Sequence, residues 1–241
     1  MGISQYSASL IHRLVKATGI NQQAGNENSV LTLGRQNMWD RSAPEDFFKK
    51  NGFGVTDSLD SSDFEGANII HNMNEPIGES LKERYSLLID GGTLEHVFDV
   101  KTFLFNCASL VKLQGHVLHQ VPLNNHINHG FYQISPTLLY AFYDDNGFTP
   151  LSFGIHFLNK SSGTAEREML WTDEPEQLRR IGLSCRIVLP DFVTPNTLVS
   201  MSFFARKTGR VRLSIPQQPF YSDKYRGDSY SNLKSIFKIS S

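Results

Sequence analysis

The segment between residues 85 and 121 constrains the fold more than any other part of this sequence. Tyr85–Asp90 (YSLLID) is an apolar run typical of a buried strand, and it ends at Gly91-Gly92. Asp99–Leu113 has apolar residues at helical spacing, with Asp99 as N-cap and Gly115 as the predicted stop. His116–Val121 (HVLHQV) then predicts another strand. A strand, a helix and a strand in this order normally form a parallel crossover, so we predict a parallel sheet.

The rest of the chain repeats this alternation. Ile3–Thr18 predicts a helix, and Ser29–Leu33 predicts a buried strand followed by a tight turn at Gly34. Ser42 and Glu45 have the spacing of a capping box for a helix that reaches Lys50. Further elements are predicted at 53–56, 67–71, 136–145, 149–158, 175–181, 184–189 and 197–205. We therefore predict a doubly wound α/β fold, with a mostly parallel sheet and helices on both faces.

We expect three parts along the chain. An N-terminal helix and linker occupy residues 1–28, one α/β domain occupies 29–220, and a polar tail occupies 221–241.

The formal net charge of −1 gives no reason to expect nucleic acid or an anionic membrane as partner. The two cysteines form no CxxC pair, and the N-terminus lacks the apolar run of a signal peptide. These features favour a cytoplasmic protein that spans no membrane.

The segment Asp90-Gly-Gly-Thr-Leu-Glu-His is the first candidate site, because ligands of such sheets bind beyond the carboxyl ends of the strands. Gly91 and Gly92 allow the backbone to approach a ligand closely. Glu95 or His96 is a candidate general base. The alternative is a tight turn in which Thr93 caps a short helix and both side chains are solvated.

The second candidate segment is Pro122-Leu-Asn-Asn-His-Ile-Asn-His-Gly, which follows the strand ending at Val121. Its amides and imidazoles are suited to hydrogen-bonding a polar substrate and to moving protons. We predict that the working site lies where 90–96 and 122–136 meet. A metal-assisted site is an alternative, with ligands of suitable type at Glu95, His96, His126 and His129, but no known spacing rule selects these residues. We assign no metal.

The chain also resembles a known family. The residues YSLLI, LEHVF and LQGHVLHQVP, in this order, resemble the central part of class I S-adenosylmethionine-dependent methyltransferases. HGFYQISP resembles a bacterial subgroup of methyltransferase-like proteins, VLTLG resembles the first strand with its glycine, and TLVSMSFFARKT resembles a terminal strand. The resemblance implies a Rossmann-like, seven-stranded sheet in which only the last strand is antiparallel. It also implies S-adenosylmethionine as cofactor.

The resemblance assigns roles to particular residues. Cofactor contacts are implied for the glycine loop, for an acid that holds the ribose, for a polar residue at the adenine and for the turn beside the sulfonium: Gly34, Gln36, Asp57 or Asp60, Asn72, Asp90, Gly91 and Gly92. Substrate contacts are implied for Asn124, Asn125, His126 and Tyr132. The implied base is His129 or His96, with Glu95 orienting the imidazole.

The implied reaction is methyl transfer to oxygen or nitrogen of a polar small molecule or sugar-like acceptor. One departure concerns the family's first loop, which normally reads acidic-x-Gly-x-Gly. Here it reads Thr32-Leu-Gly-Arg-Gln-Asn, so the acid and the second glycine are missing. Either Gln36 or Trp39 substitutes in a working loop, or the chain is a non-catalytic methyltransferase-like binding domain that has lost the cofactor.

Overall fold

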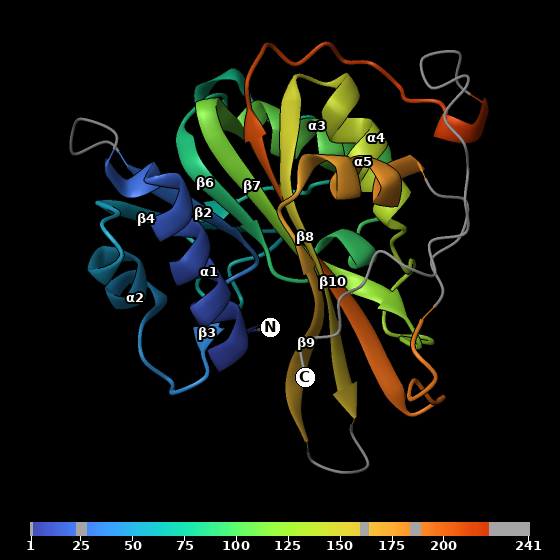
Figure 1. The fold of residues 1–241 in the computed structure, drawn as a ribbon. Helices are drawn as coiled ribbons and strands as arrows, with labels where there is room; N and C mark the ends of the chain where they lie inside the picture. Colours follow the sequence, from blue (N-terminus) through green and yellow to red (C-terminus); the bar gives the residue numbers. More distant parts are fainter. Residues whose placement is uncertain (1, 23–27, 160–163, 184–188, 222–241) are drawn as a thin grey trace. The chain divides into compact units, whose positions relative to one another are not determined.

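The computed structural model describes residues 2–22, 28–159, 164–183 and 189–221. Its internal contacts divide the chain into two compact units, Met1–His119 and Gln120–Ser241. We call these unit 1 and unit 2 and describe each by itself (Figure 1). The chain passes from one to the other within a single strand, β7 (Val111–Asn124).

Unit 1 is built on a parallel sheet. Its strands are β2 (Ser29–Leu33), β4 (Val55–Asp60), β5 (Ile69–Ile70), β6 (Tyr85–Asp90) and the first part of β7, in the order β5-β4-β2-β6-β7. All the pairings are parallel, for example Leu31 with Asp57 and Leu31 with Leu88. Every residue of β2 and β6 is buried, which explains their nearly continuous apolar sequences. The carboxyl ends of these strands therefore lie at one edge.

The helices of unit 1 have identifiable starts and stops. Helix α1 (Gln5–Thr18) begins at Ser4, whose hydroxyl accepts a hydrogen bond from Ser7 N, and ends at Gly19 with φ 62°. Helix α3 (Val100–Leu110) begins at Asp99, which accepts from Thr102 N, as predicted. Helix α2 (Pro44–Lys50) contacts β4. Smaller elements are β1 (Gly2–Ile3) paired with β3 (Asn37–Met38), and the 3-10 turns η1 (Ile20–Gln22), η2 (Glu79–Leu81) and η3 (Leu94–His96).

Two local predictions are wrong. The capping box fails because Ala43 is the N-cap of α2, Ser42 bonds to Asp40, and Glu45 pairs with Arg35 instead. Gly115 does not end a helix, because α3 passes directly into β7 at Val111. A Cβ at Gly115 would lie 2.8 Å from Val111 Cγ1 and 2.9 Å from Tyr85 O. This glycine therefore allows close backbone approach at the bulge between β6 and β7.

Unit 2 is an antiparallel sheet with helices packed on it. Strand β10 (Thr197–Lys207) lies next to β7 in the strand order and pairs antiparallel with β8 (Phe148–Asn159), which pairs antiparallel with β9 (Thr164–Thr172). Helices α4 (Pro136–Asp145) and α5 (Pro175–Leu183) contact each other and β8, as Figure 1 shows. A 3-10 turn, η4 (Pro219–Tyr221), follows. The sheet is mixed and has eight described strands, so the predicted seven-stranded sheet with one antiparallel strand is corrected.

The elements agree with the sequence where long apolar runs defined them. The strands at 29–33 and 85–90 and the helices near 5–18 and 136–145 are confirmed. The strand predicted at 53–56 lies instead at Val55–Asp60, and its Asp57 is buried and accepts a hydrogen bond from Tyr85 Oη. Most of the element predicted at 184–189 lies outside the described residues. The three parts predicted along the chain remain a prediction beside the division into two units.

Candidate functional site

Asp90 organises the carboxyl end of β6. It is fully buried, and its Oδ1 accepts hydrogen bonds from Thr93 N at 2.8 Å and Leu94 N at 3.4 Å. Its Oδ2 lies 2.7 Å from Nδ1 of His119, which is also fully buried on the neighbouring strand β7. The carboxylate therefore fixes the turn that follows it and ties that turn to β7. Asp90 is surrounded by protein groups on both of its oxygens.

Glu95 lies in the turn that Asp90 holds. Its side chain is 2% exposed, and burial together with the charge of Asp90 raises its pKa to about 8. Glu95 Oε1 lies 3.9 Å from Nε2 of His96, whose side chain is 40% exposed. The prediction of a solvated Glu95 is therefore wrong, while His96 does reach solvent. A buried carboxyl whose pKa is near neutrality, beside an exposed imidazole, is suited to proton transfer.

The turn after β2 contains the departure from the family pattern. Gly34 has φ 73°, and its amide donates to Leu59 O at 2.7 Å. Gln36 is 1% exposed, and its Nε2 donates to Leu33 O at 2.9 Å. A Cβ placed at Gly91 would lie 3.1 Å from Gln36 Oε1. The missing side chain of Gly91 therefore makes room for the amide of Gln36.

The Oε1 atom of Gln36 is a buried acceptor. It has no hydrogen-bond partner within the part of the chain that the structure describes. Such an atom costs free energy unless a donor reaches it. Thr93 strengthens the same junction, because its hydroxyl donates to Leu33 O at 3.1 Å. The ends of β2 and β6 are thus joined by side chains.

Asp57 and Asp60 occupy different positions on β4. Asp57, in the interior of β4, accepts hydrogen bonds from Tyr85 Oη at 2.8 Å and from Asn68 Nδ2 at 2.6 Å. Its carboxylate is therefore used within the protein. Asp60 is the last residue of β4, is partly exposed, and accepts from Ser61 N at 2.6 Å. Of the two alternatives, Asp60 lies at the carboxyl edge of the sheet.

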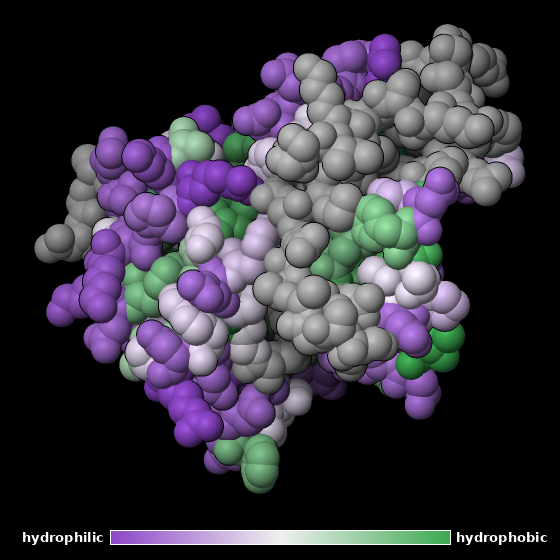
Figure 2. Space-filling view, turned by 60° about the horizontal axis from the view of Figure 1, so that its bottom comes forward, coloured by the Kyte–Doolittle hydropathy of each residue, from purple (hydrophilic) through white to green (hydrophobic). Residues whose placement is uncertain are grey.

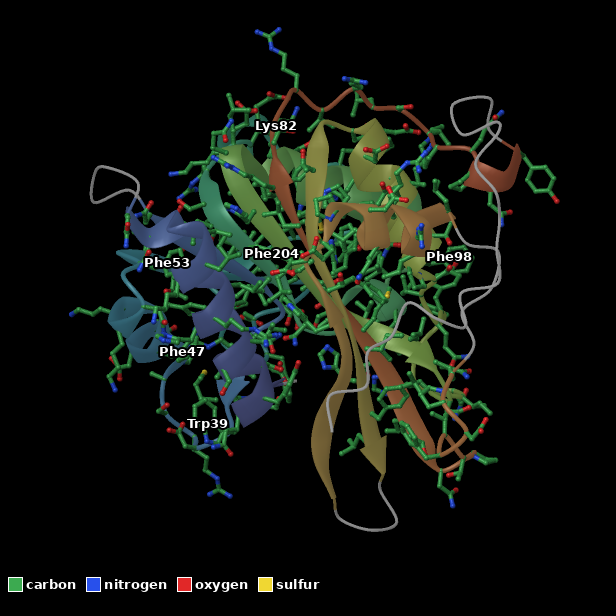
Figure 3. All side chains as sticks on the ribbon, viewed as in Figure 1. Trp39, Phe47, Phe53, Lys82, Phe98 and Phe204 are labelled. Atoms are coloured by element: carbon green, nitrogen blue, oxygen red, sulfur yellow. The ribbon has the colours of Figure 1, made fainter. Side chains whose placement is uncertain are left out.

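Two more predicted residues of unit 1 lie in turns that follow short strands. Asn72 follows β5 after His71, is exposed, and accepts from Asn74 N at 3.1 Å, so it shapes its own turn. Trp39 follows β3 and is 48% exposed; its amide donates to Ile3 O. Figure 3 labels Trp39 and the 70% exposed Phe98, which comes two residues after His96. Trp39 therefore belongs to the β1–β3 pair rather than to the Gly34 turn.

The loop after β7 lies in unit 2, and several of its polar groups form hydrogen bonds within the protein. Asn125, with φ 60°, donates from Nδ2 to Thr194 O at 3.0 Å and Thr197 O at 2.8 Å. His126 N donates to Gln133 Oε1 at 3.1 Å, and its Nε2 lies 3.2 Å from Ser200 Oγ. These two residues hold the loop against the start and body of β10.

The remaining loop candidates are more accessible. His129 is exposed, its amide donates to His126 O at 3.2 Å, and the two imidazole centroids are 5.6 Å apart. Tyr132 is half-buried, with its ring 6.3 Å from that of Phe131. Asn124 is exposed and lines a pocket of unit 2. Of the catalytic candidates, Glu95 and His96 belong to unit 1 and His129 belongs to unit 2.

His119, on the strand predicted at His116–Val121, is a buried partner of Asp90 that the sequence analysis did not assign to the site. It stands opposite Asp90 in the register of β6 and β7. Aligning the two predicted strands would have placed an imidazole beside the carboxylate. The close packing of Gln36 on Gly91 had no comparable signal, because it depends on the path of the turn after β2.

Comparison with known proteins finds similar solved structures but no similar sequence family. The sequence matches no protein-family model and no curated protein. A solved structure from Galdieria sulphuraria, assigned as a sarcosine dimethylglycine methyltransferase, superposes with a TM-score of 0.52 at 14% identity, covering 86% of this chain and 87% of that one. The chain has the class I methyltransferase fold. At this identity the likeness concerns the fold alone.

Two further solved structures are similar at lower scores. The YcgJ protein from Bacillus subtilis has 12% identity and a TM-score of 0.49, over 85% of this chain and 99% of that one. A SAM-dependent methyltransferase from Archaeoglobus fulgidus has 14% identity and a TM-score of 0.47, over 83% and 95%.

The described helices include none long and apolar enough to cross a bilayer. On the face that Figure 2 shows, hydrophilic residues predominate and hydrophobic residues form small separate groups.

Proposed function

We propose that the protein transfers a methyl group from S-adenosylmethionine to an oxygen or nitrogen of a polar small molecule or sugar-like acceptor. The observation that carries the proposal is Glu95, a buried carboxyl with a pKa of about 8 at the carboxyl end of β6, in a chain with the class I methyltransferase fold. Methyl transfer needs an aligned acceptor and a group that accepts its proton. Glu95 and His96 supply candidates for that group.

The side chains at the carboxyl edge of unit 1 fit the cofactor in two respects. Asp60 offers a partly exposed carboxylate for the ribose hydroxyls. Gln36 Oε1 is a buried acceptor that lacks a donor among the described residues, and an ammonium group is such a donor. Gly34, Asn72, Asp90, Gly91 and Gly92 complete the proposed cofactor contacts. When bound, S-adenosylmethionine supplies an activated methyl group.

The chain's own residues then handle the proton of the acceptor. In this proposal His96 or His129 takes it, and Glu95 orients the imidazole; Glu95 is the partner of His96 because Glu95 Oε1 and His96 Nε2 are 3.9 Å apart. With a pKa of about 8, Glu95 is mostly protonated at pH 7. Turnover should therefore rise with pH through about 8, as the carboxylate forms. Asn124, Asn125, His126 and Tyr132 are the proposed acceptor contacts.

Calorimetric titration with S-adenosylmethionine and S-adenosylhomocysteine tests the cofactor first. We expect saturable binding that Asp60→Asn weakens by about tenfold, because a charged hydrogen bond is lost. Asp63→Asn, an exposed carboxylate three residues away, is the matched control and should bind like the wild type. Equal affinities for the two variants would remove Asp60 from the site.

An acceptor screen with radiolabelled cofactor tests the base. His129→Ala and His96→Ala should identify it, since the base variant lowers turnover much more than cofactor affinity. His71→Ala, whose ring contacts Glu75 O, serves as a control outside the proposed chemistry. Loss of affinity equal to the loss of turnover would argue against a base role for that histidine.

The packing of Gln36 favours a second candidate, a non-catalytic domain that has lost the cofactor. The family pattern has glycine at position 36, whereas here the amide of Gln36 packs against Gly91. Thr32 stands where the family has an acidic residue. In this case the wild type does not bind cofactor at millimolar concentration, whereas Gln36→Gly binds it. Weaker binding by Gln36→Gly than by the wild type would instead support the working loop.

A further inference from the structure

Unit 2 contains a pocket that shares only Asn124 with the acceptor contacts proposed above. Its volume is about 610 Å³, within the range of roughly 300–1,000 Å³ typical of small-molecule sites. The lining comes from the end of β7, the segment before α4, the two helices, one residue between α5 and β10, and a segment after β10: Leu123, Asn124, Gln133, Ile134, Ser135, Pro136, Thr137, Leu138, Ala141, Ile181, Leu189, Pro216, Gln217 and Gln218. All of these residues belong to unit 2.

Two contacts fix the inner walls. Ile134, which is buried, donates its amide to Pro122 O at 2.8 Å, so the chain before α4 is held on the end of β7. Helices α4 and α5 meet at Tyr140 and Gly182, where an added Cβ would lie 2.1 Å from the ring. Only glycine permits this approach, and it brings Ala141 and Ile181 to the pocket. These inner walls are therefore set by a backbone hydrogen bond and by the packing of two helices.

Asn146 holds the outer wall. This residue is fully buried at the end of α4, and its Nδ2 donates to Ser214 O at 2.9 Å. In return, Ser214 N donates to Asn146 Oδ1 at 2.9 Å. The segment that contains Pro216 and Gln218 is thereby anchored although it belongs to no helix or strand. Walls held in this way lower the entropic cost of ordering the pocket when a ligand binds.

The lining chemistry identifies the class of ligand. None of the lining residues is charged. Leucine, isoleucine, proline and alanine form most of the surface, and the amides of Asn124, Gln217 and Gln218 are exposed at the rim. An ionic group would lose its hydration here without gaining a charged partner, whereas hydroxyl and amide groups can pair with the rim. We propose that this pocket binds a neutral, largely apolar molecule that bears hydroxyl or amide groups.

A neutral fluorescent probe tests the proposal without reference to methyl transfer. N-phenyl-1-naphthylamine has an apolar body and one N–H donor, and its fluorescence is excited directly during titration of the full chain. We expect saturable binding that octyl β-glucoside, below its micelle concentration, displaces. The related 1-anilinonaphthalene-8-sulfonate has the same aromatic body with a charge, and it should bind at least about tenfold more weakly.

Matched variants locate the probe. Thr137→Trp places a large side chain in the pocket and should weaken probe binding by about tenfold or more. Thr149→Trp, at an exposed position on β8, should bind like the wild type. Leu138→Trp is a second filling variant, and circular dichroism melting checks that each variant folds. Equal probe affinity for both threonine variants, or no saturation, would overturn the site, and equal affinity for the sulfonate would overturn its neutrality.

Discussion

The two units use different means to shape their candidate sites. In unit 1 the carboxyl ends of the parallel strands are joined by buried polar groups, with Asp90 bonded to His119 and Gln36 bonded to Leu33 O. In unit 2 the pocket walls are set by packing, with Tyr140 on Gly182, and by one buried amide, Asn146. The stability of unit 1 should therefore depend on charge and pH, and that of unit 2 on side-chain volume.

The difference follows from strand direction. Parallel strands bring all their carboxyl ends to one edge, so polar residues that follow separate strands gather there. Antiparallel strands alternate in direction, so their ends do not gather at one edge, and the unit 2 pocket instead lies among α4, α5, the end of β7 and the segment after β10. Three substitutions, two in unit 1 and one in unit 2, test this difference through their effects on the free energy of unfolding.

Asp90→Ala should have the largest effect. The substitution removes the carboxylate that accepts from Thr93 N and Leu94 N and contacts His119, all in a buried environment. We expect a loss of about 4 kcal/mol in the free energy of unfolding, measured with urea at pH 7. Asp60→Ala, at a partly exposed carboxylate, should cost about 0.5 kcal/mol or less. Similar losses for both would show that the buried network does not stabilise unit 1.

Glu95→Gln should reveal the pH sensitivity of unit 1. The pKa of Glu95 is raised from 4.5 to about 8, so the folded state holds this proton more tightly than the unfolded state does. Wild-type stability should consequently fall as pH rises from about 4.5 to about 8. Glutamine cannot ionise, so the variant should avoid this loss, which the difference between 4.5 and about 8 sets at a few kcal/mol at pH 8.

The measurement is urea unfolding of both proteins at several pH values. Glu79→Gln, an exposed carboxyl paired with Lys82, is the control and should follow the wild type. Parallel pH profiles for wild type and Glu95→Gln would contradict the raised pKa.

Gly182→Ala should have the smallest of the three effects and should act on unit 2. Its Cβ would lie 2.1 Å from Tyr140 Cγ, so α4 and α5 must separate. We expect a loss of about 1–3 kcal/mol in thermal or urea unfolding, together with weaker binding of the neutral probe. Gly78→Ala meets nothing within 4 Å and should leave both quantities unchanged. Unchanged probe binding by Gly182→Ala would show that the pocket does not depend on the contact between α4 and α5.

Local sequence signals were sufficient where burial is continuous. The runs SVLTL and YSLLID specified β2 and β6, and Asp99 specified the start of α3. They failed where a residue's role depends on a distant partner. Ser42 and Glu45 have capping-box spacing, yet Glu45 pairs with Arg35. Gly115 follows a helix in the sequence, yet its lack of a side chain serves a close approach to Tyr85 O.

The candidate site shows the same division. The glycines and carboxylates of the segment from Asp90 to Glu95 were recognised because each residue type has a chemistry of its own. Sequence spacing did not distinguish Asp57 from Asp60, since the partners of Asp57, Tyr85 and Asn68, come from other elements. The predicted site segment 122–136 includes the part of the unit 2 pocket that precedes α4, but the remaining walls come from α4, α5 and segments far along the chain, and no local signal linked them.

The sequence by itself determined the parallel α/β order of unit 1 and the residues that stand at its strand ends, because apolar period and turn chemistry are local properties. The tertiary structure decided three further points: the burial of Glu95, the packing of Gln36 on Gly91, and the pocket anchored by Asn146. Each of these depends on which atoms from distant segments exclude water from a side chain. That exclusion sets pKa values and pocket shape, and it exists only after the chain has folded.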